Sequence, residues 1–156
     1  MTKTILIFFA ALLGSLPLHA QLQKVLHRPF EVDSAQVIVL DLYGDYLVEP
    51  WAGDNILIEM TVKLYQASDG LLKHFIEKEK RYEIDTLREG EVFKLISKDK
   101  KRTPIKTPHG ECFETVEMRV FLPDRFDPDG EKRWKRRTAP VEVEKSGQKA
   151  ENGSGN

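Results

Sequence analysis

A period of two along residues 56–65 constrains the fold of this chain more than any other feature. The apolar side chains at every second position are Ile56, Ile58, Met60, Val62 and Leu64. Successive side chains of a β-strand point to opposite faces of a sheet, so this period places all of them on one face. The segment therefore predicts a half-buried strand, and a chain that contains it must form a sheet.

Shorter segments with strand character lie on both sides of this one. They are residues 37–42, 46–49, 82–86, 92–97 and 115–122. Turn-forming residues separate them, among them Gly53 with Asp54 and Asn55, and the spacer that contains Gly90 is typical of a hairpin. The chain therefore predicts several strands joined mainly by short turns, with a polar loop over residues 98–110.

One stretch has helical periodicity instead. Its apolar residues are Leu71, Leu72, Phe75 and Ile76, and Ser68 or Asp69 can cap its start. We therefore expect a mainly β domain at residues 21–126, with one short helix. The sheet is expected to be mostly antiparallel, arranged as a sandwich or as a short solenoid-like coil.

The first 20 residues have the three parts of a secretory signal. Lys3 supplies the positive start, residues 5–13 are apolar, and the stretch ends at the small residue Ala20. The apolar run is shorter than the roughly 20 residues that span a bilayer, and its flanks favour a signal over a retained anchor or a buried strand. We expect cleavage between Ala20 and Gln21, no membrane anchor afterwards, and a periplasmic or extracellular protein.

Residues 127–156 lack apolar periodicity. They include the basic run 132–137 and end in Gly, Ser, Asn, Gln, Lys and Glu. Such a composition does not offset the entropy lost on ordering, so it predicts a disordered polar tail.

Charge and cysteine content exclude several classes of function. The chain has 24 Lys and Arg against 25 Asp and Glu, so no general attraction to nucleic acid is expected. The basic runs 98–102 and 132–137 predict a solvated loop and tail, with binding to an anionic surface as the alternative. Cys112 is the single cysteine, which predicts a buried small side chain rather than an internal disulfide, or else an intermolecular bridge or a reactive thiol.

The sequence predicts no catalytic, cofactor or metal site. His109 with Glu111 and Cys112 resembles a fragment of a ligand cluster, but a metal site needs three or four converging donors. Acidic residues such as Glu59 and Glu117 alternate with core positions, as the solvated face of a sheet requires.

The order of motifs resembles that of a known family. An apolar strand is followed by Gly44-Asp45, a short strand, Trp51-Ala-Gly53-Asp54 and a long alternating strand, and a later strand ends at Pro123. Over residues 38–123 this order resembles the DUF4097-like putative adhesins of Bacteroidetes. The resemblance implies a β-solenoid-type fold and an adhesin-like role, and it carries over no catalytic residue.

The chain departs from that family after Pro123, where family members continue with further stacked strands. Since stacked repeats bury one another, the chain is expected to be either a minimal, sandwich-like version or a truncated relative that needs a partner.

These observations predict an exported, non-catalytic interaction module that binds another envelope or surface protein through a sheet face or edge. Candidate contact residues are Trp51, Tyr65 and Trp134, although strand packing also accounts for the first two. One alternative is an envelope-stress or regulatory accessory that accepts a partner's strand at a free sheet edge. Another is an uncharacterised hydrolase, and no feature of the sequence sets an oligomeric state.

Overall fold

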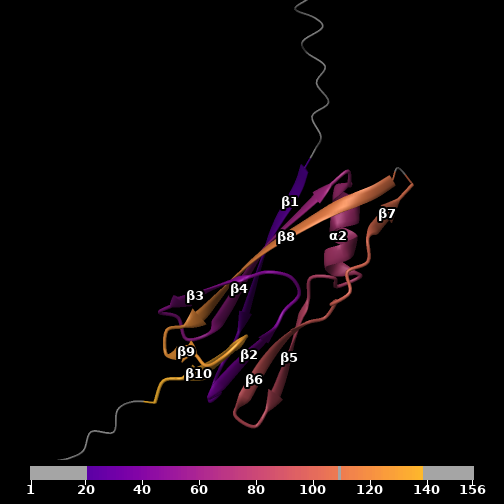
Figure 1. Cartoon of the computed structure of the whole chain (residues 1–156). Coiled ribbons are helices and arrows are strands. Elements are labelled where there is room, and N and C mark those ends of the chain that lie inside the picture. Colours follow the sequence, from indigo (N-terminus) through magenta and orange to yellow (C-terminus); the bar gives the residue numbers. More distant parts are fainter. Residues whose placement is uncertain (1–20, 109, 139–156) are drawn as a thin grey trace, which may run out of the picture.

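The computed structural model, which describes residues 21–108 and 110–138, consists of two mixed β-sheets and one helix (Figure 1). The strands are β1 (Gln21–Phe30), β2 (Val37–Asp41), β3 (Leu47–Trp51), β4 (Ile56–Tyr65), β5 (Ile84–Glu89), β6 (Val92–Ser97), β7 (Ile105–Thr107), β8 (Gly110–Pro123), β9 (Phe126–Pro128) and β10 (Arg133–Arg136). The helix is α2 (Asp69–Glu77). The predicted mainly β fold with one short helix is confirmed.

The first sheet has the strand order β1-β4-β8-β3, and β7 pairs with the start of β8. Its central pair is antiparallel, so that Met60 of β4 lies opposite Met118 of β8 and Leu26 of β1. β3 pairs with the end of β8 in parallel. β1 and β4 have ten residues each and β8 has 14, so these strands run along the long axis of the molecule (Figure 1).

The second sheet has the order β5-β6-β2-β10-β9. β5 and β6 form the predicted antiparallel hairpin, whose turn contains Gly90 with a φ of +59°, a backbone conformation that favours glycine. β2 and β6 run parallel. Pairing in the described residues is thus mostly antiparallel, as predicted, with parallel exceptions at β2·β6 and β3·β8.

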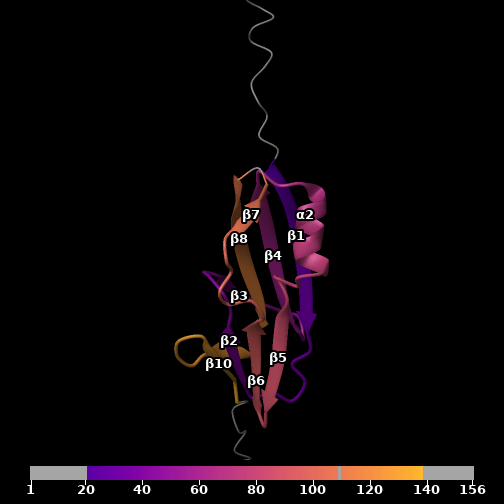
Figure 2. The same cartoon turned by 90° about the vertical axis from the view of Figure 1, so that its right-hand side faces the viewer.

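The core lies between the two sheets and under α2. All five apolar residues of the β4 alternation are buried, and so are Met118, Val120 and Leu122 on the same face of β8. The second sheet contributes Ile38, Leu40, Phe93 and Leu95 to the same cluster. Figures 1 and 2 show α2 and the second sheet on the same side of the first sheet, so one apolar face of long strands is covered by both.

α2 starts at the predicted cap. The Ser68 Oγ accepts a hydrogen bond from the backbone N–H of Leu71 at 3.3 Å, which satisfies one of the free donors of the first turn. The helix begins two residues earlier than the apolar pattern alone indicates, because Asp69 and Gly70 form its first turn. Leu72 is buried against the core. In the described residues no helix is both long and apolar enough to cross a bilayer.

The predicted boundary of the disordered tail at residue 127 is wrong. β9 and β10 extend the second sheet, and Trp134 lies opposite Ile38 of β2. The Arg136 guanidinium donates to the carbonyl oxygens of Ala35 and Asp33 at 2.8 and 2.9 Å, which fixes β10 to the loop between β1 and β2. Order therefore continues to at least residue 138, and the predicted tail beyond it and the signal at residues 1–20 lie outside the described residues.

Candidate functional site

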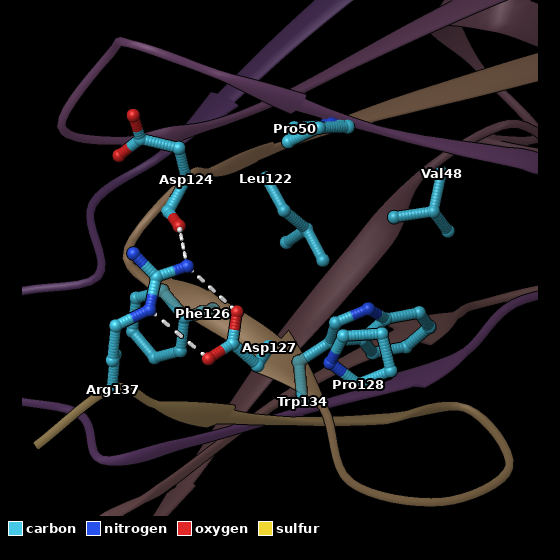
Figure 3. Close-up of a pocket in the computed structure, with 9 residues that line it drawn as sticks. All are labelled: Val48, Pro50, Leu122, Asp124, Phe126, Asp127, Pro128, Trp134 and Arg137. Atoms are coloured by element: carbon cyan, nitrogen blue, oxygen red, sulfur yellow. Dashed lines mark hydrogen bonds and ion pairs between the residues drawn. The ribbon is translucent and has the colours of Figure 1, made fainter.

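A groove lies where an edge strand of one sheet approaches an edge strand of the other (Figure 3). β3 ends the strand order of the first sheet and β9 ends that of the second. The lining residues are Val48, Pro50, Leu122, Asp124, Phe126, Asp127, Pro128, Trp134 and Arg137, and the cavity volume is about 560 Å³. We call this feature the β3–β9 groove.

Most of the groove surface is apolar. Figure 3 shows Val48 and Pro50 on one side, Pro128 and Trp134 on the other, and Leu122 between them. Leu122 belongs to the buried core, whereas Pro50 and Pro128 are exposed. A cavity with a buried floor and exposed apolar rims removes apolar ligand surface from water, which is the main source of binding free energy in such sites.

The polar residues of the groove gather at one end. The Arg137 Nε donates to Oδ2 of Asp127 at 3.1 Å, and its Nη2 donates to Oδ1 of Asp127 at 2.8 Å and to the carbonyl of Asp124 at 3.2 Å (Figure 3). The hydrogen bonds from Arg137 hold the pKa of Asp127 below its usual range. Asp127 is therefore a carboxylate at neutral pH, and both of its oxygens accept hydrogen bonds from Arg137.

Each of the two strand edges that flank the groove contains a proline. Pro50 is in β3 and Pro128 is in β9, and a proline has no N–H to donate to a neighbouring strand. At the closed end, the N–H of Asp124 donates to the carbonyl of Trp51 at 2.9 Å. The groove is thus tied at one end while its prolines disfavour strand addition along its length.

The structure places the three predicted contact residues at separate sites. Trp134 lies in the β3–β9 groove. Trp51 and Tyr65 lie near opposite ends of the first sheet, opposite Pro123 and Phe113 of β8. Ten residues of strand separate those two positions, or roughly 33 Å. The three side chains therefore do not form one surface.

Trp51 has a local structural role. Its indole N–H donates to the carbonyl of Asn55 at 2.9 Å, and its ring packs so closely over Gly53 that a Cβ there would come within 2.4 Å of it. The ring therefore closes the predicted turn between β3 and β4, and only glycine fits at position 53.

The charged residues on the outer face of the first sheet pair across its strands, as the alternation predicts. Arg119 donates to Glu49 at 3.0 and 3.1 Å and also contacts Glu59 at 3.5 Å. Lys63 bonds Glu117. These side chains are exposed or partly exposed, so this face is a solvated surface, and its ion pairs contribute little to stability.

The basic run at residues 132–137 is not the solvated tail that its composition predicts. Arg133 pairs with Asp129 at 3.1 Å, and Arg136 and Arg137 donate to groups of the fold as described above. Their guanidinium groups hold β9 and β10 in place.

Residues 21–108 and 110–138 contain no group of three or more His, Cys, Asp or Glu side chains placed to hold a metal ion. His27 and His74 each bond a glutamate, Glu59 and Glu79, at 3.1 Å. His109, which the sequence places beside Glu111 and Cys112, lies outside the described residues.

A buried polar network that sequence patterns did not single out lies under α2. Arg81 donates from Nε and Nη2 to the Glu114 carboxylate at 3.0 and 2.9 Å, and from Nη2 to the carbonyl of Thr103 at 3.0 Å. The Tyr82 hydroxyl donates to Glu114 Oε1 at 2.6 Å. Extending the β8 alternation backwards from Leu122 by steps of two reaches Glu114, so the pattern does indicate that this carboxylate faces inward.

Opposing effects act on the ionisation of this network. Burial raises the pKa of Glu114, but hydrogen bonds from Arg81 and Tyr82 together with the nearby guanidinium charges outweigh it and hold that pKa below its usual range. Burial and the bond to Glu114 raise the pKa of Tyr82. Glu114 is therefore ionised and Tyr82 neutral at neutral pH.

We expect the Glu114 carboxylate to make the stability of this chain fall in acid. Because its pKa is lower in the folded than in the unfolded state, its contribution is complete above the ordinary value of 4.5 and is lost as the pH falls through the depressed one. Urea unfolding of Glu114→Gln between about pH 5 and pH 3 should show a flatter loss of stability than the unmodified chain. Glu117→Gln, on the exposed face, is the control and should leave the slope unchanged, whereas an equal slope for all three proteins would contradict the assignment.

Cys112 is a buried free thiol one step of the alternation before Glu114. Burial raises its pKa, so the thiolate form is disfavoured. This placement agrees with the predicted small apolar side chain rather than with a reactive nucleophile.

The sequence matches no protein-family model, no curated protein and no solved structure. The resemblance to DUF4097-like putative adhesins therefore stays a prediction.

Proposed function

We propose that this chain is an exported, non-catalytic binding module whose β3–β9 groove takes an extended apolar segment of an envelope or surface protein. The observation that carries the proposal is the groove itself, an apolar cavity of about 560 Å³ between two sheet edges. The three-part leader over residues 1–20 supports export, and the resemblance to putative adhesins agrees with a binding role.

The shape and lining of the groove favour an extended segment rather than a compact ligand. The groove is lined by Pro50, Pro128 and the ring of Trp134. Apolar grooves with aromatic side chains bind extended segments whose backbone is already ordered before binding, such as polyproline II helices. Since the two prolines disfavour strand pairing, recognition depends on ligand side chains that enter the groove. The ion pair between Arg137 and Asp127 limits the apolar part of the groove at one end.

Selection of peptides from a random library on the mature domain tests this function. We expect enrichment of peptides with apolar and proline residues, and a loss of affinity of about tenfold or more with Trp134→Ala or Pro50→Asp, because large buried aromatic anchors dominate such interfaces.

Leu47→Asp is the matched control. Leu47 is in the same strand as Pro50 and is exposed, but it lies outside the groove lining. Affinity should be unchanged in Leu47→Asp, and thermal unfolding of all three variants separates lost binding from lost folding. Failure to select any peptide, or an equal loss with Leu47→Asp, would contradict the proposal.

A second candidate function is strand-edge binding of a regulatory partner, and the observation that favours it is β1. This strand has ten residues and ends the strand order of the first sheet. Pro29 is its only proline, so its first half offers backbone groups to a partner strand. Selected peptides with strong strand propensity that bind Trp134→Ala and Pro50→Asp normally would assign the function to β1 instead.

A further inference from the structure

A second cavity lies at the opposite end of β8 from the β3–β9 groove. Its volume is about 310 Å³, and it is lined by Tyr43, by Arg81, by the loop residues 102–104, and by Ile105 and residues 111–114 of the β7–β8 hairpin. Its lining therefore combines apolar side chains with two arginines, Arg81 and Arg102, and two glutamates, Glu111 and Glu114.

Arg102 is buried without the partners that a buried guanidinium needs. Only 9% of the residue is exposed, and its Nε and Nη1 are buried with no hydrogen-bond partner. Its neighbour Arg81 is equally buried, yet all three of its nitrogens donate hydrogen bonds. An unpaired buried donor destabilises a fold, and more so if it is charged, so Arg102 is unfavourable for the free protein.

Two further features set Arg102 apart. Its backbone φ is +25°, a strained value for a residue with a Cβ. Its guanidinium carbon lies 4.6 Å from the centroid of the Tyr43 ring and 5.2 Å from that of Tyr82. These rings compensate part of the lost hydration by cation–π attraction, but they do not occupy its donors. Strain combined with unsatisfied polarity is characteristic of a binding position rather than of a structural one.

The charges around the cavity select the sign of the ligand. Burial lowers the pKa of Arg102, but an arginine stays charged at neutral pH. Glu114 neutralises Arg81, to which it is bonded twice. Asp99, about one third exposed, lies 3.4 Å from Arg81 and accepts the backbone N–H of Arg102, and Glu111 is on the exposed rim. Arg102 thus lacks a carboxylate of its own, and nearby acids disfavour a dianion.

We propose that this cavity binds the carboxylate of a small organic acid, with Arg102 as the contact to the anion and Tyr43 as a cover that moves aside. Tyr43 suits this role because 38% of it is exposed and because it is its backbone N–H, not its ring, that donates a hydrogen bond to Ser97 Oγ at 2.9 Å. Swinging its ring away uncovers the guanidinium. Ile105, Pro104 and Phe113 then contact the apolar body of the ligand.

Benzoate and its neutral isostere benzamide, added to the mature domain, test the proposal. Saturable binding of benzoate is expected. It is measured by the rise in melting temperature and by changes in the amide chemical shifts of residues 99–105 and 111–114. Benzamide should bind about 10- to 100-fold more weakly, since a charged hydrogen bond is lost. Arg102→Met should weaken benzoate by the same factor while melting at or above the temperature of the unmodified domain, because an unpaired buried charge is removed.

Pro50→Asp is the control, because it alters the β3–β9 groove and should leave benzoate binding unchanged. Equal affinity for benzoate and benzamide, or equal binding by Arg102→Met, would overturn the proposal without bearing on the groove. Binding of inorganic phosphate in place of benzoate would overturn the choice of a carboxylate, and no saturable binding of either anion would overturn the proposal of an anion site at Arg102. If Arg102→Met does not fold, the comparison of benzoate with benzamide on the unmodified domain still decides the matter.

Discussion

Replacement of Arg81 by methionine is expected to lower the free energy of unfolding by about 3–5 kcal/mol, because removing one member of a buried ion pair leaves the other charged and desolvated. The Arg81 side chain is 7% exposed and that of Glu114 is 13% exposed, so solvent screens this pair little. The variant also breaks the bond to the Thr103 carbonyl that holds the loop between β6 and β7. Urea unfolding at neutral pH measures the loss.

Arg119→Met provides a matched control for this prediction. Arg119 makes the same two-bond contact to a glutamate, Glu49, but on the exposed face of the first sheet. The expected loss of unfolding free energy is much smaller than for Arg81→Met, because surface pairs are screened by water. A double replacement, Arg81→Met with Glu114→Leu, should recover much of the stability, since it removes both buried charges. Similar losses for Arg81→Met and Arg119→Met would contradict the importance of burial here.

Replacement of Ile58 by alanine is the second change with a large expected effect. Ile58 is fully buried at the middle of the apolar face of β4, opposite Val120 of β8. Removing its methyl and methylene groups forfeits their burial and leaves a cavity, and the expected loss is about 2–5 kcal/mol. Thermal or urea unfolding gives the value.

Leu57→Ala is the comparison within the same strand. Leu57 is adjacent in sequence but points to the outer face of the sheet and is only partly buried. The expected loss is clearly smaller than that for Ile58→Ala, because a partly exposed side chain loses less burial and leaves no closed cavity. A larger loss at position 57 than at position 58 would mean that the register of β4 is shifted by one residue.

Periodicity predicted the local elements where it was long or supported by turn residues. β4 has the bounds that the alternation over residues 56–65 indicates, and α2 has Ser68 as its cap. The hairpin around Gly90 also follows from its turn residues. Each of these signals is local, since side-chain direction, capping and turn conformation depend on residues close together in the chain.

Strands that depend on distant partners were missed. β10 has only four residues and a basic composition, which alone resembles a solvated tail. It is a strand because β2, almost one hundred residues earlier in the chain, pairs with it. β1 alternates weakly, and its pairing with β4 rather than its own pattern makes it part of the sheet.

The two candidate sites show the same division. Of the groove residues, sequence reasoning singled out only Trp134 as a contact, because the wall opposite it comes from Val48 and Pro50 of another sheet. Arg81 and Glu114 resemble ordinary surface residues until the inward face of β8 is followed back to position 114. Arg102 lies in a polar loop, where nothing local indicates that its guanidinium is buried.

By itself the sequence determined which side chains face the core, where α2 starts and that the chain builds pleated sheets, since these follow from the geometry of neighbouring residues. Only the tertiary structure decided which strand edges approach each other and that two prolines flank an open groove. It also decided that, of the two buried arginines Arg81 and Arg102, Arg102 has no carboxylate partner. Those properties depend on contacts between segments far apart in the chain, whose pairing is set by the free energy of the whole fold rather than by any local pattern.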